Sequence, residues 1–197
     1  FNQCGEVNFA EENGLECLRS NTDALLGKIR RKYKEYGINE KPFVVIKADN
    51  GTGGMGIMTV RDAKDIDALS PKARERMATV QGGMPVSEVI LQEGVHTFET
   101  VGEGVAEPVV YMMDHYVVGG FYRIHTERGR NENLNAPGMQ FKPLAFDTSC
   151  IMPDVDLAPD APPNRFYAYG VVARLALLAA SVEIEETEPV HEIGEAA

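Results

Sequence analysis

Apolar residues recur with a helical period over residues 21–36. From Leu25 onward they are spaced by three and four residues, which is typical of an amphipathic helix with one buried face. Residues 21–23 offer side chains that cap a helix, and Gly37 offers the left-handed residue that often ends one. We therefore expect an amphipathic helix from residue 21 to residue 36.

A second helix is predicted near the end of the chain, over residues 165–182. Its apolar residues occupy more than one face, so we expect it to be largely buried. A polar stretch at residues 61–79 also has helical character, and Ser70-Pro71 interrupts it.

Short apolar runs bounded by turn-forming residues predict the strands. The last two of them should pair through a turn near Asp114 and His115. The predicted strands are residues 42–47, 57–60, 87–92, 108–113 and 116–125. Together with the helices they indicate an α+β or α/β protein.

Charge narrows the range of partners. The 197 residues include 30 acidic and 19 basic side chains, giving a formal charge of -11, which argues against nucleic acid or an anionic membrane as the main partner. Six glutamates in residues 183–197 indicate a solvated acidic tail. The basic cluster at residues 28–34 fits the exposed face of the first helix better than a phosphate site.

The cysteines indicate a reducing compartment. Cys4, Cys17 and Cys150 are odd in number and widely spaced, so neither a disulfide framework nor a zinc site is supported, and a cytoplasmic location fits best. The chain has no uninterrupted run of 18 apolar residues and no leader pattern. Because it opens on Phe1, we expect it to be incomplete at its N-terminus.

A glycine-rich segment at residues 47–56 is the most informative motif. Four glycines in six residues free the backbone to direct several N–H groups at one anion, for which phosphate is the natural guest. No Lys-Ser or Lys-Thr follows Gly56, which excludes a Walker A loop, and strand residues follow where a dinucleotide fold needs a helix. The segment therefore predicts a hairpin lid over phosphates, with a ligand-free glycine turn as the alternative.

Two cationic side chains lie where burial requires an anion. Lys47 ends an apolar strand just before the glycines, which favours phosphate binding. Arg123 lies among apolar residues of a hairpin and cannot lose its proton, so its partner is either phosphate or a carboxylate, of which Glu107 is the leading candidate.

Two further stretches suit a nucleotide site. The strand that ends near Gln92 and Glu93 could form an apolar wall for adenine, although a plain sheet strand has the same pattern. Amide and carboxylate oxygens crowd residues 128–138, and Mg²⁺ prefers such ligands, although asparagine-rich turns are also ordinary. The four histidines lack metal-binding spacing, and no Ser or Cys nucleophile motif is present.

The order of four features along the chain resembles the ATP-grasp ligases, glutathione synthetase in particular. The features are Lys47 with its glycine lid, residues 91–95, a hairpin ending at Arg123, and a loop at residues 133–138. Residues 45–60 and 173–181 more closely resemble the proteobacterial glutamate-cysteine ligase family with that fold. The resemblance implies an ATP-grasp-like α+β fold with antiparallel or mixed sheets, a glycine-rich lid hairpin and packing helices.

The resemblance also implies an activity. ATP would phosphorylate the γ-carboxylate of L-glutamate, and the amine of L-cysteine would attack the acyl phosphate, which is the first step of glutathione synthesis. Another ATP-grasp ligase such as glutathione synthetase, and a non-catalytic nucleotide-binding module, stay open as alternatives. The implied divisions are a helical lead-in at 1–40, a lid subdomain at 41–92, a catalytic subdomain at 93–182 and the acidic tail.

By position, the resemblance gives Lys47 and Arg123 catalytic roles, the first on the α- and β-phosphates and the second on the transferring phosphoryl group. The residues expected to bind ATP besides Lys47 are Gly51, Thr52, Gly53, Gly54, Met55, Gly56, Gln92, Glu93 and Val95. Glu107, Asn133 and Asn135 are the Mg²⁺ candidates. Glutathione synthetase takes its Mg²⁺ ligands from an E-x-N stretch after the long helix, and this chain has no such asparagine there.

Overall fold

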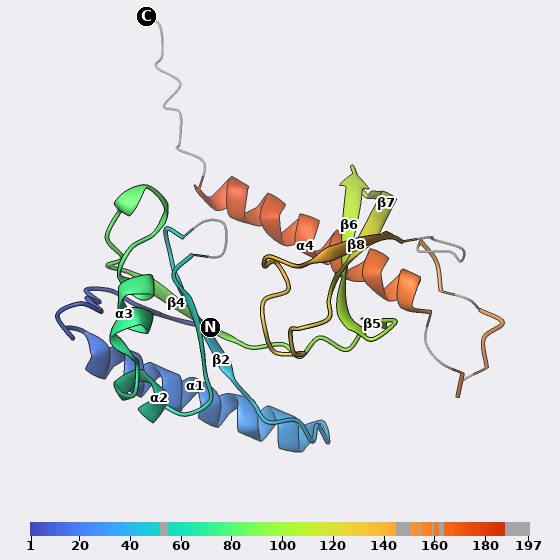
Figure 1. The fold of residues 1–197 in the computed structure, drawn as a ribbon. Coiled ribbons are helices and arrows are strands. Elements are labelled where there is room, and N and C mark those ends of the chain that lie inside the picture. Colours follow the sequence, from blue (N-terminus) through green and yellow to red (C-terminus); the bar gives the residue numbers. More distant parts are fainter. Residues whose placement is uncertain (52–54, 145–150, 154, 159, 162–163, 188–197) are drawn as a thin grey trace, which may run out of the picture. The chain divides into compact units, whose positions relative to one another are not determined.

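A computed structural model describes residues 1–51, 55–144, 151–153, 155–158, 160–161 and 164–187. The chain divides into two compact units, each with its own sheet (Figure 1). Unit 1 comprises residues 1–97 with 130–132, and unit 2 comprises residues 98–129 with 133–197. All strand pairings in the described residues are antiparallel, which confirms an α+β chain with antiparallel sheets.

Unit 1 contains a four-stranded sheet of order β1-β4-β2-β3. The strands are β1 (Asn2–Cys4), β2 (Val44–Ala48), β3 (Ile57–Val60) and β4 (Val89–Glu93). β2 and β3 form the predicted hairpin around the glycine-rich segment, with Lys47 opposite Ile57. β4 pairs with the other side of β2 and places Ile90 opposite Lys47. The sequence pattern predicted all of these strands except the short edge strand β1.

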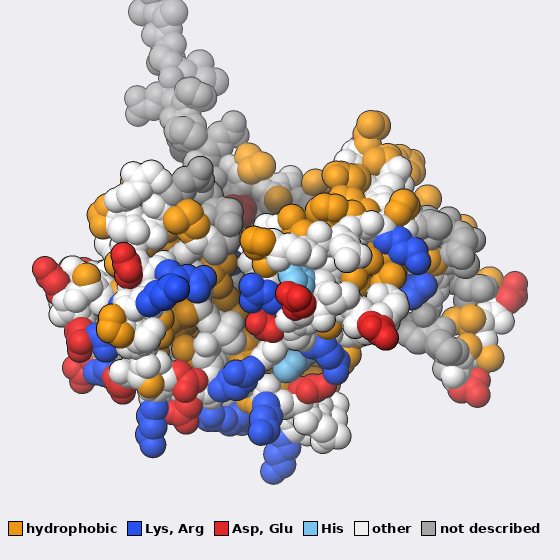
Figure 2. Space-filling view, in the orientation of Figure 1, with side chains coloured by type: hydrophobic (Ala, Val, Ile, Leu, Met, Phe, Trp, Pro, Cys, Tyr) orange, Lys and Arg blue, Asp and Glu red, His pale blue; other side chains and the backbone are white. Residues whose placement is uncertain are grey.

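Helix α1 (Leu15–Glu35) covers one face of this sheet (Figure 1). Its buried residues, among them Leu18 and Leu26, pack against the inward side chains of β2 and β4, such as Ile46 and Leu91. The predicted start at residue 21 was wrong, because the left-handed Gly14 precedes the first turn and the helix begins six residues earlier. The basic cluster at residues 28–34 lies on the exposed side, as predicted (Figure 2).

Two short helices follow the hairpin, as the interrupted polar stretch predicted. They are α2 (Lys64–Asp67) and α3 (Pro71–Ala78), and the 3-10 turn η1 (Gln81–Gly83) leads on to β4. Ser70 caps α3, since its hydroxyl accepts a hydrogen bond from the Ala73 amide at 3.2 Å. Ile66 and Met77 anchor the two helices in the core of unit 1.

Unit 2 is built on a sheet of order β5-β6-β7-β8. Its strands are β5 (Thr100–Val101), β6 (Gly104–Met113), β7 (Tyr116–His125) and β8 (Gln140–Pro143). Asp114 takes a left-handed conformation, φ 53°, in the tight turn that was predicted between β6 and β7. A small core of Ala106, Tyr122 and Ile124 packs against Leu144 and Phe166.

Helix α4 (Arg165–Thr187) has the predicted position but not the predicted burial. Only Phe166 and Gly170 are buried, whereas Leu175 and Leu178 are about 60% exposed. Its apolar residues surround the helix, and the strands that contact it, β6 and β7, can cover only one side. The helix also includes residues 183–187 of the predicted tail; residues 188–197 lie outside the described residues.

By length and composition alone, α4 could also span a membrane. A buried helix of a soluble protein can have the same length and composition, so this observation is weak evidence for a membrane. The predicted absence of a membrane partner stays a prediction.

Candidate functional site

Lys47 lies on the open face of the unit 1 sheet. Its neighbours on β2, Ile46 and Ala48, point into the core beneath α1, so Lys47 points to the other side. The side chain is half-buried, and its ammonium has no hydrogen bond or ion pair with any described residue. A half-buried cation without a protein partner is well suited to bind an anion.

The register places Gln92 on the same face as Lys47. Gln92 is opposite Val45, two residues along β2 from Lys47, and side chains two residues apart share a face. Glu93 is opposite the buried Val44 and therefore projects to the α1 side, where Tyr33 lies. Burial raises the pKa of Tyr33, and the charge of Glu93 adds to that effect. Of the predicted nucleoside contacts, the side chain of Gln92 thus lies on the face of Lys47, while that of Glu93 does not.

The chain leaves β4 through a tightly packed glycine. A Cβ on Gly94 would lie 1.9 Å from the Phe43 ring, and the Gly94 amide donates to the Phe43 carbonyl at 2.9 Å. His96 packs edge-on against the same ring, with 4.9 Å between centroids. Val95, the remaining predicted nucleoside contact, is 79% exposed.

The base of the glycine-rich segment is closed by backbone hydrogen bonds. The Ala48 amide donates to the Gly56 carbonyl at 2.8 Å, and the Gly51 amide donates to the Ala48 carbonyl at 3.2 Å. Gly56 has φ +63°, and a Cβ there would lie 2.9 Å from the Ala48 Cβ, so glycine is required. Thr52, Gly53 and Gly54 lie outside the described residues. Since the Gly51 amide is used within the turn, a phosphate role for this segment depends on its other amides.

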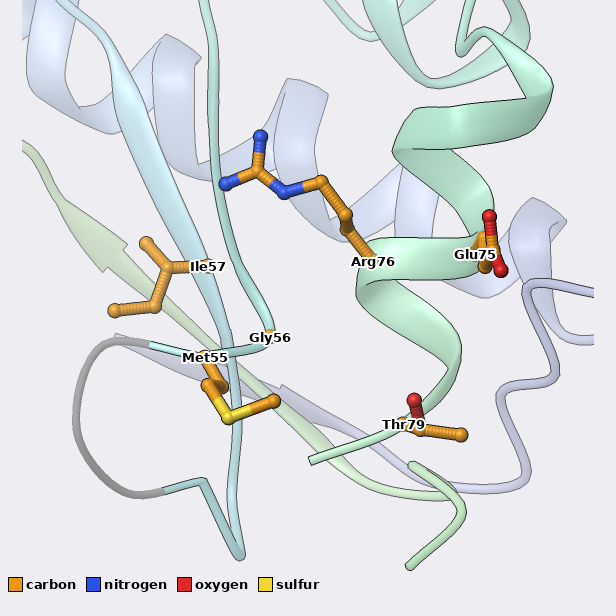
Figure 3. A pocket seen from close by; sticks show the side chains of 6 residues that line it. All are labelled: Met55, Gly56, Ile57, Glu75, Arg76 and Thr79. Carbon is orange, nitrogen blue, oxygen red and sulfur yellow. The ribbon is translucent and has the colours of Figure 1, made fainter. Parts of the chain in front are cut away.

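A cavity of about 340 Å³ lies between this segment and α3. Met55, Gly56 and Ile57 line one side, and Arg76 reaches toward β3 from α3 (Figure 3). The Arg76 guanidinium is exposed and has no ion pair among the described residues. The sequence analysis missed this cation, because residues 61–79 indicated only a polar helix and nothing local placed Arg76 beside the glycines.

In unit 2, Arg123 is paired with a carboxylate. The Arg123 Nη1 atom lies 2.7 Å from Glu107 Oε1, and the two residues are directly opposite each other on β7 and β6. Their side chains are 24% and 34% exposed, and the buried Nε of Arg123 has no described partner. The internal partner considered for Arg123 is therefore present, and its guanidinium is not fully satisfied by the described residues.

Aromatic rings surround this ion pair on the same face of the sheet. Phe141 is opposite Arg123, and Phe121 lies two residues before it on β7. The Phe121 ring packs edge-on against Phe141, with 5.3 Å between centroids, and at a tilt of 50° against Tyr111, with 5.9 Å between centroids. A shallow cavity of about 420 Å³ lies over β7 and β8 beside these rings, where Figure 2 shows apolar side chains gathered.

The loop after β7 is held by His125, which the sequence analysis set aside for lack of metal spacing. His125 is 3% exposed, and its Nδ1 accepts from the Glu127 amide at 3.2 Å. Nε2 must then carry the proton, which it donates to the Pro137 carbonyl at 3.0 Å. A neutral histidine thus connects both ends of the loop that contains Asn133 and Asn135.

The predicted Mg²⁺ candidates, Glu107, Asn133 and Asn135, stay a prediction. Asn133 and Asn135 are exposed, and Asn133 Oδ1 accepts from the Asn135 amide at 2.9 Å, as in an ordinary Asx turn. Glu107 Oε1 already accepts from Arg123. Among the described residues, no group of three or more His, Cys, Asp and Glu side chains is placed to hold a metal ion.

A polar network attaches α4 to the sheet of unit 2. The Tyr169 hydroxyl donates to Glu99 and lies 3.4 Å from the Tyr122 hydroxyl. Burial is the main cause that raises the pKa of Tyr169, and the bond to Glu99 adds to it. This network holds the helix against the sheet that carries Arg123.

The predicted site residues thus fall into two groups. Lys47, Gln92 and the glycine-rich segment belong to unit 1, and Arg123, Glu107 and the two asparagines belong to unit 2. Both groups lie on or beside antiparallel sheets. The first includes a lysine that has no hydrogen bond or ion pair with the described residues and lies next to a glycine hairpin.

Comparison with known proteins identifies the family. The profile of the glutamate-cysteine ligase family matches residues 1–184, and no curated protein matches the chain. A 1.90 Å crystal structure of a provisionally named gamma-glutamylcysteine synthetase from Methylobacillus flagellatus KT is 62% identical, with a TM-score of 0.81. The match covers 95% of this chain and 44% of that one, so this chain spans less than half the length of its relative. The chain belongs to the glutamate-cysteine ligase family.

Proposed function

We propose that this chain carries the ATP-binding part of an ATP-dependent ligase that joins the γ-carboxylate of L-glutamate to the amine of L-cysteine. The family and the relative named for gamma-glutamylcysteine synthetase support this reaction. The two antiparallel sheets and the glycine hairpin support an ATP-grasp arrangement. The free thiols of Cys4 and Cys17 suit the reducing cytoplasm.

The single observation that carries the proposal is the ammonium of Lys47, which lies beside the glycine hairpin and has no partner in the part of the chain that the structure describes. ATP offers the anion that this group lacks, and Gln92 on the same face is available to the nucleoside. Lys47 would hold the α- and β-phosphates, while the hairpin amides would close over them.

Arg123 is proposed to act on the reacting groups. Glu107 holds its guanidinium from one side, and the two side chains are 24% and 34% exposed. A cation held in place in a partly buried site stabilises charge that develops in the transition state. Arg123 would thus favour transfer of the phosphoryl group and then stabilise the acyl phosphate.

In the proposed reaction, a γ-carboxylate oxygen of glutamate attacks the terminal phosphorus of ATP, and ADP leaves. The cysteine amine then attacks the acyl carbon, loses a proton and displaces phosphate. Magnesium, when bound to ATP, would neutralise phosphate charge. Glu107, Asn133 and Asn135 are the residues that would hold it, with Glu107 shared with Arg123 and Asn133 shared with the Asn135 amide.

The test is ADP production by the intact parent protein with glutamate, cysteine and Mg²⁺, omitting each in turn. We expect full turnover to require all of them, and Arg123→Ala to lose turnover while it retains most of the ATP affinity. ADP release stimulated by γ-glutamylcysteine and glycine instead would favour a glutathione synthetase reaction. ATP-induced stabilisation without ADP from either substrate pair would indicate a non-catalytic nucleotide-binding module.

A further inference from the structure

Two cysteines that are 13 residues apart lie side by side in unit 1. Cys4 ends the edge strand β1 and Cys17 lies in the first turn of α1, with 3.2 Å between their sulfur atoms. Forming a disulfide would require the sulfurs to approach by roughly 1 Å. None of the proposed ligase chemistry uses this pair.

The pair lies within a small polar cluster. The Asn21 side-chain amide donates to Cys17 Sγ at 3.3 Å and to Cys4 Sγ at 3.4 Å. Asn2 donates to Asn21 Oδ1 at 3.0 Å, which directs the Asn21 amide nitrogen toward the two sulfurs. Both thiols therefore face a shared hydrogen-bond donor that can stabilise a thiolate.

The two sulfurs differ in access. Cys17 is exposed, whereas Cys4 is 2% exposed. Burial, with the bond from Cys17 as a smaller cause, raises the pKa of the Cys4 thiol to about 12. An exposed attacking thiol next to a buried partner is the arrangement of a dithiol that reacts stepwise with an external disulfide.

We propose that Cys4 and Cys17 form a reversible modification site that is oxidised by low-molecular-weight disulfides. The Cys17 thiolate attacks one sulfur of the external disulfide, and one external thiolate leaves. The Cys4 thiol then loses its proton and attacks Cys17 Sγ, which releases the second external thiolate. Overall, two protein thiols are oxidised to one disulfide and the external disulfide is reduced to two thiols. Excess external thiol reverses both steps.

The bond would tie the edge of the sheet to the helix that covers it. β1 pairs with β4 through Asn2 and Leu91, so a bridge from Cys4 to α1 would restrain that edge strand. A bridge closing a short loop reduces the freedom of the unfolded chain, so the oxidised protein should melt at a higher temperature. This inference does not depend on ATP binding or turnover.

The test is to incubate the intact protein with glutathione disulfide, alkylate the free thiols and map the peptides. No Lys or Arg lies between Cys4 and Cys17, so both cysteines share one tryptic peptide that ends at Arg19, and cleavage after glutamate is used to separate them. We expect the fragment ending at Glu6 to stay joined to the fragment beginning at Cys17, and dithiothreitol to release it. The Cys150→Ser variant should behave like the wild type.

Two further variants separate the steps. Cys4→Ala should stop at a mixed disulfide on Cys17, whereas in Cys17→Ser the Cys4 thiol should react roughly tenfold or more slowly. If Cys4→Ala does not fold, the wild-type peptide map alone decides. Any of three results would overturn the proposal. Cys4 and Cys17 could both still react with the alkylating agent after unfolding, a mixed disulfide could persist on Cys17 of the wild type, or a bridge could form to Cys150.

Discussion

Glu107 and Arg123 are directly opposite each other in the β6-β7 hairpin, with 2.7 Å between Glu107 Oε1 and Arg123 Nη1. A β-bulge sets this pairing. Near the turn, Met112 is opposite Val117, but Tyr111 is opposite Gly119, so Val118 has no partner. If Val118 were paired in a regular register from the turn, with no bulge, Glu107 would lie opposite Tyr122.

Glu107→Gln should destabilise unit 2, because it leaves the Arg123 guanidinium partly buried without a countercharge. We expect a loss of about 1 to 2 kcal/mol in the free energy of unfolding, measured by urea titration. Glu103→Gln, in the exposed turn before β6, is the matched control and should change little. Equal losses in the two variants would show that the ion pair has no special role.

Gly94→Ala should destabilise unit 1. A Cβ there would lie 1.9 to 2.5 Å from three atoms of the Phe43 ring, so the ring or the chain must move, at a cost of about 1 to 3 kcal/mol. Gly5→Ala is the control, since a Cβ at Gly5 meets nothing within 4 Å. Combining Gly94→Ala with Phe43→Leu should recover part of the loss, and a purely additive result would be evidence against the clash.

Tyr169 should make stability fall at high pH. Its pKa is raised in the folded state from the ordinary 10.0, so above about pH 10 the unfolded chain loses the phenol proton first. The free energy of unfolding should therefore decline as the pH rises past about 10, and Tyr169→Phe should weaken the decline. Urea titrations at pH 9 and pH 11 measure the decline in the free energy of unfolding. If the Tyr169→Phe variant showed the same decline as the wild type, the prediction would be contradicted. Tyr33→Phe provides the comparison in unit 1, since burial raises that pKa too.

Arg76→Gln should weaken ATP binding, because it removes a cation from the cavity beside the glycine-rich segment. The group is exposed, so we expect an effect of about two- to fivefold in Kd, larger at low salt. Lys72→Gln, also exposed on α3, is the matched control. An equal change in both variants would indicate a general charge effect and not a contact at the cavity.

Local sequence patterns predicted much of the fold. Turn residues at Asp114 and the glycines set the turn ends of the β6-β7 and β2-β3 hairpins, which were predicted within one residue. The far end of β6 was wrong, because the strand begins at Gly104, four residues before the predicted start. The edge strands β1, β5 and β8 were missed, because two to four residues carry little periodicity and gain their partners only in the folded chain.

Contacts between residues that are far apart in the sequence were harder to predict from local patterns. The sequence indicated two possible partners for Arg123, and the bulge at Val118, which no local pattern announced, selects Glu107. The adjacency of Cys4 and Cys17 depends on how β1 meets α1, and their spacing in the chain had suggested no pairing. Likewise, the apolar composition of α4 predicted burial, but only its first turns meet the sheet.

The central claim, that Lys47 and the glycine hairpin bind the phosphates of ATP, is tested most directly by titrating the protein with ATP in a calorimeter. Lys47→Ala is compared with the wild type and with Lys28→Ala, which removes an exposed lysine from α1. Loss of a charged hydrogen-bond donor should weaken binding by about tenfold or more. The account predicts that loss for Lys47→Ala alone; equal affinity in all three proteins would contradict it.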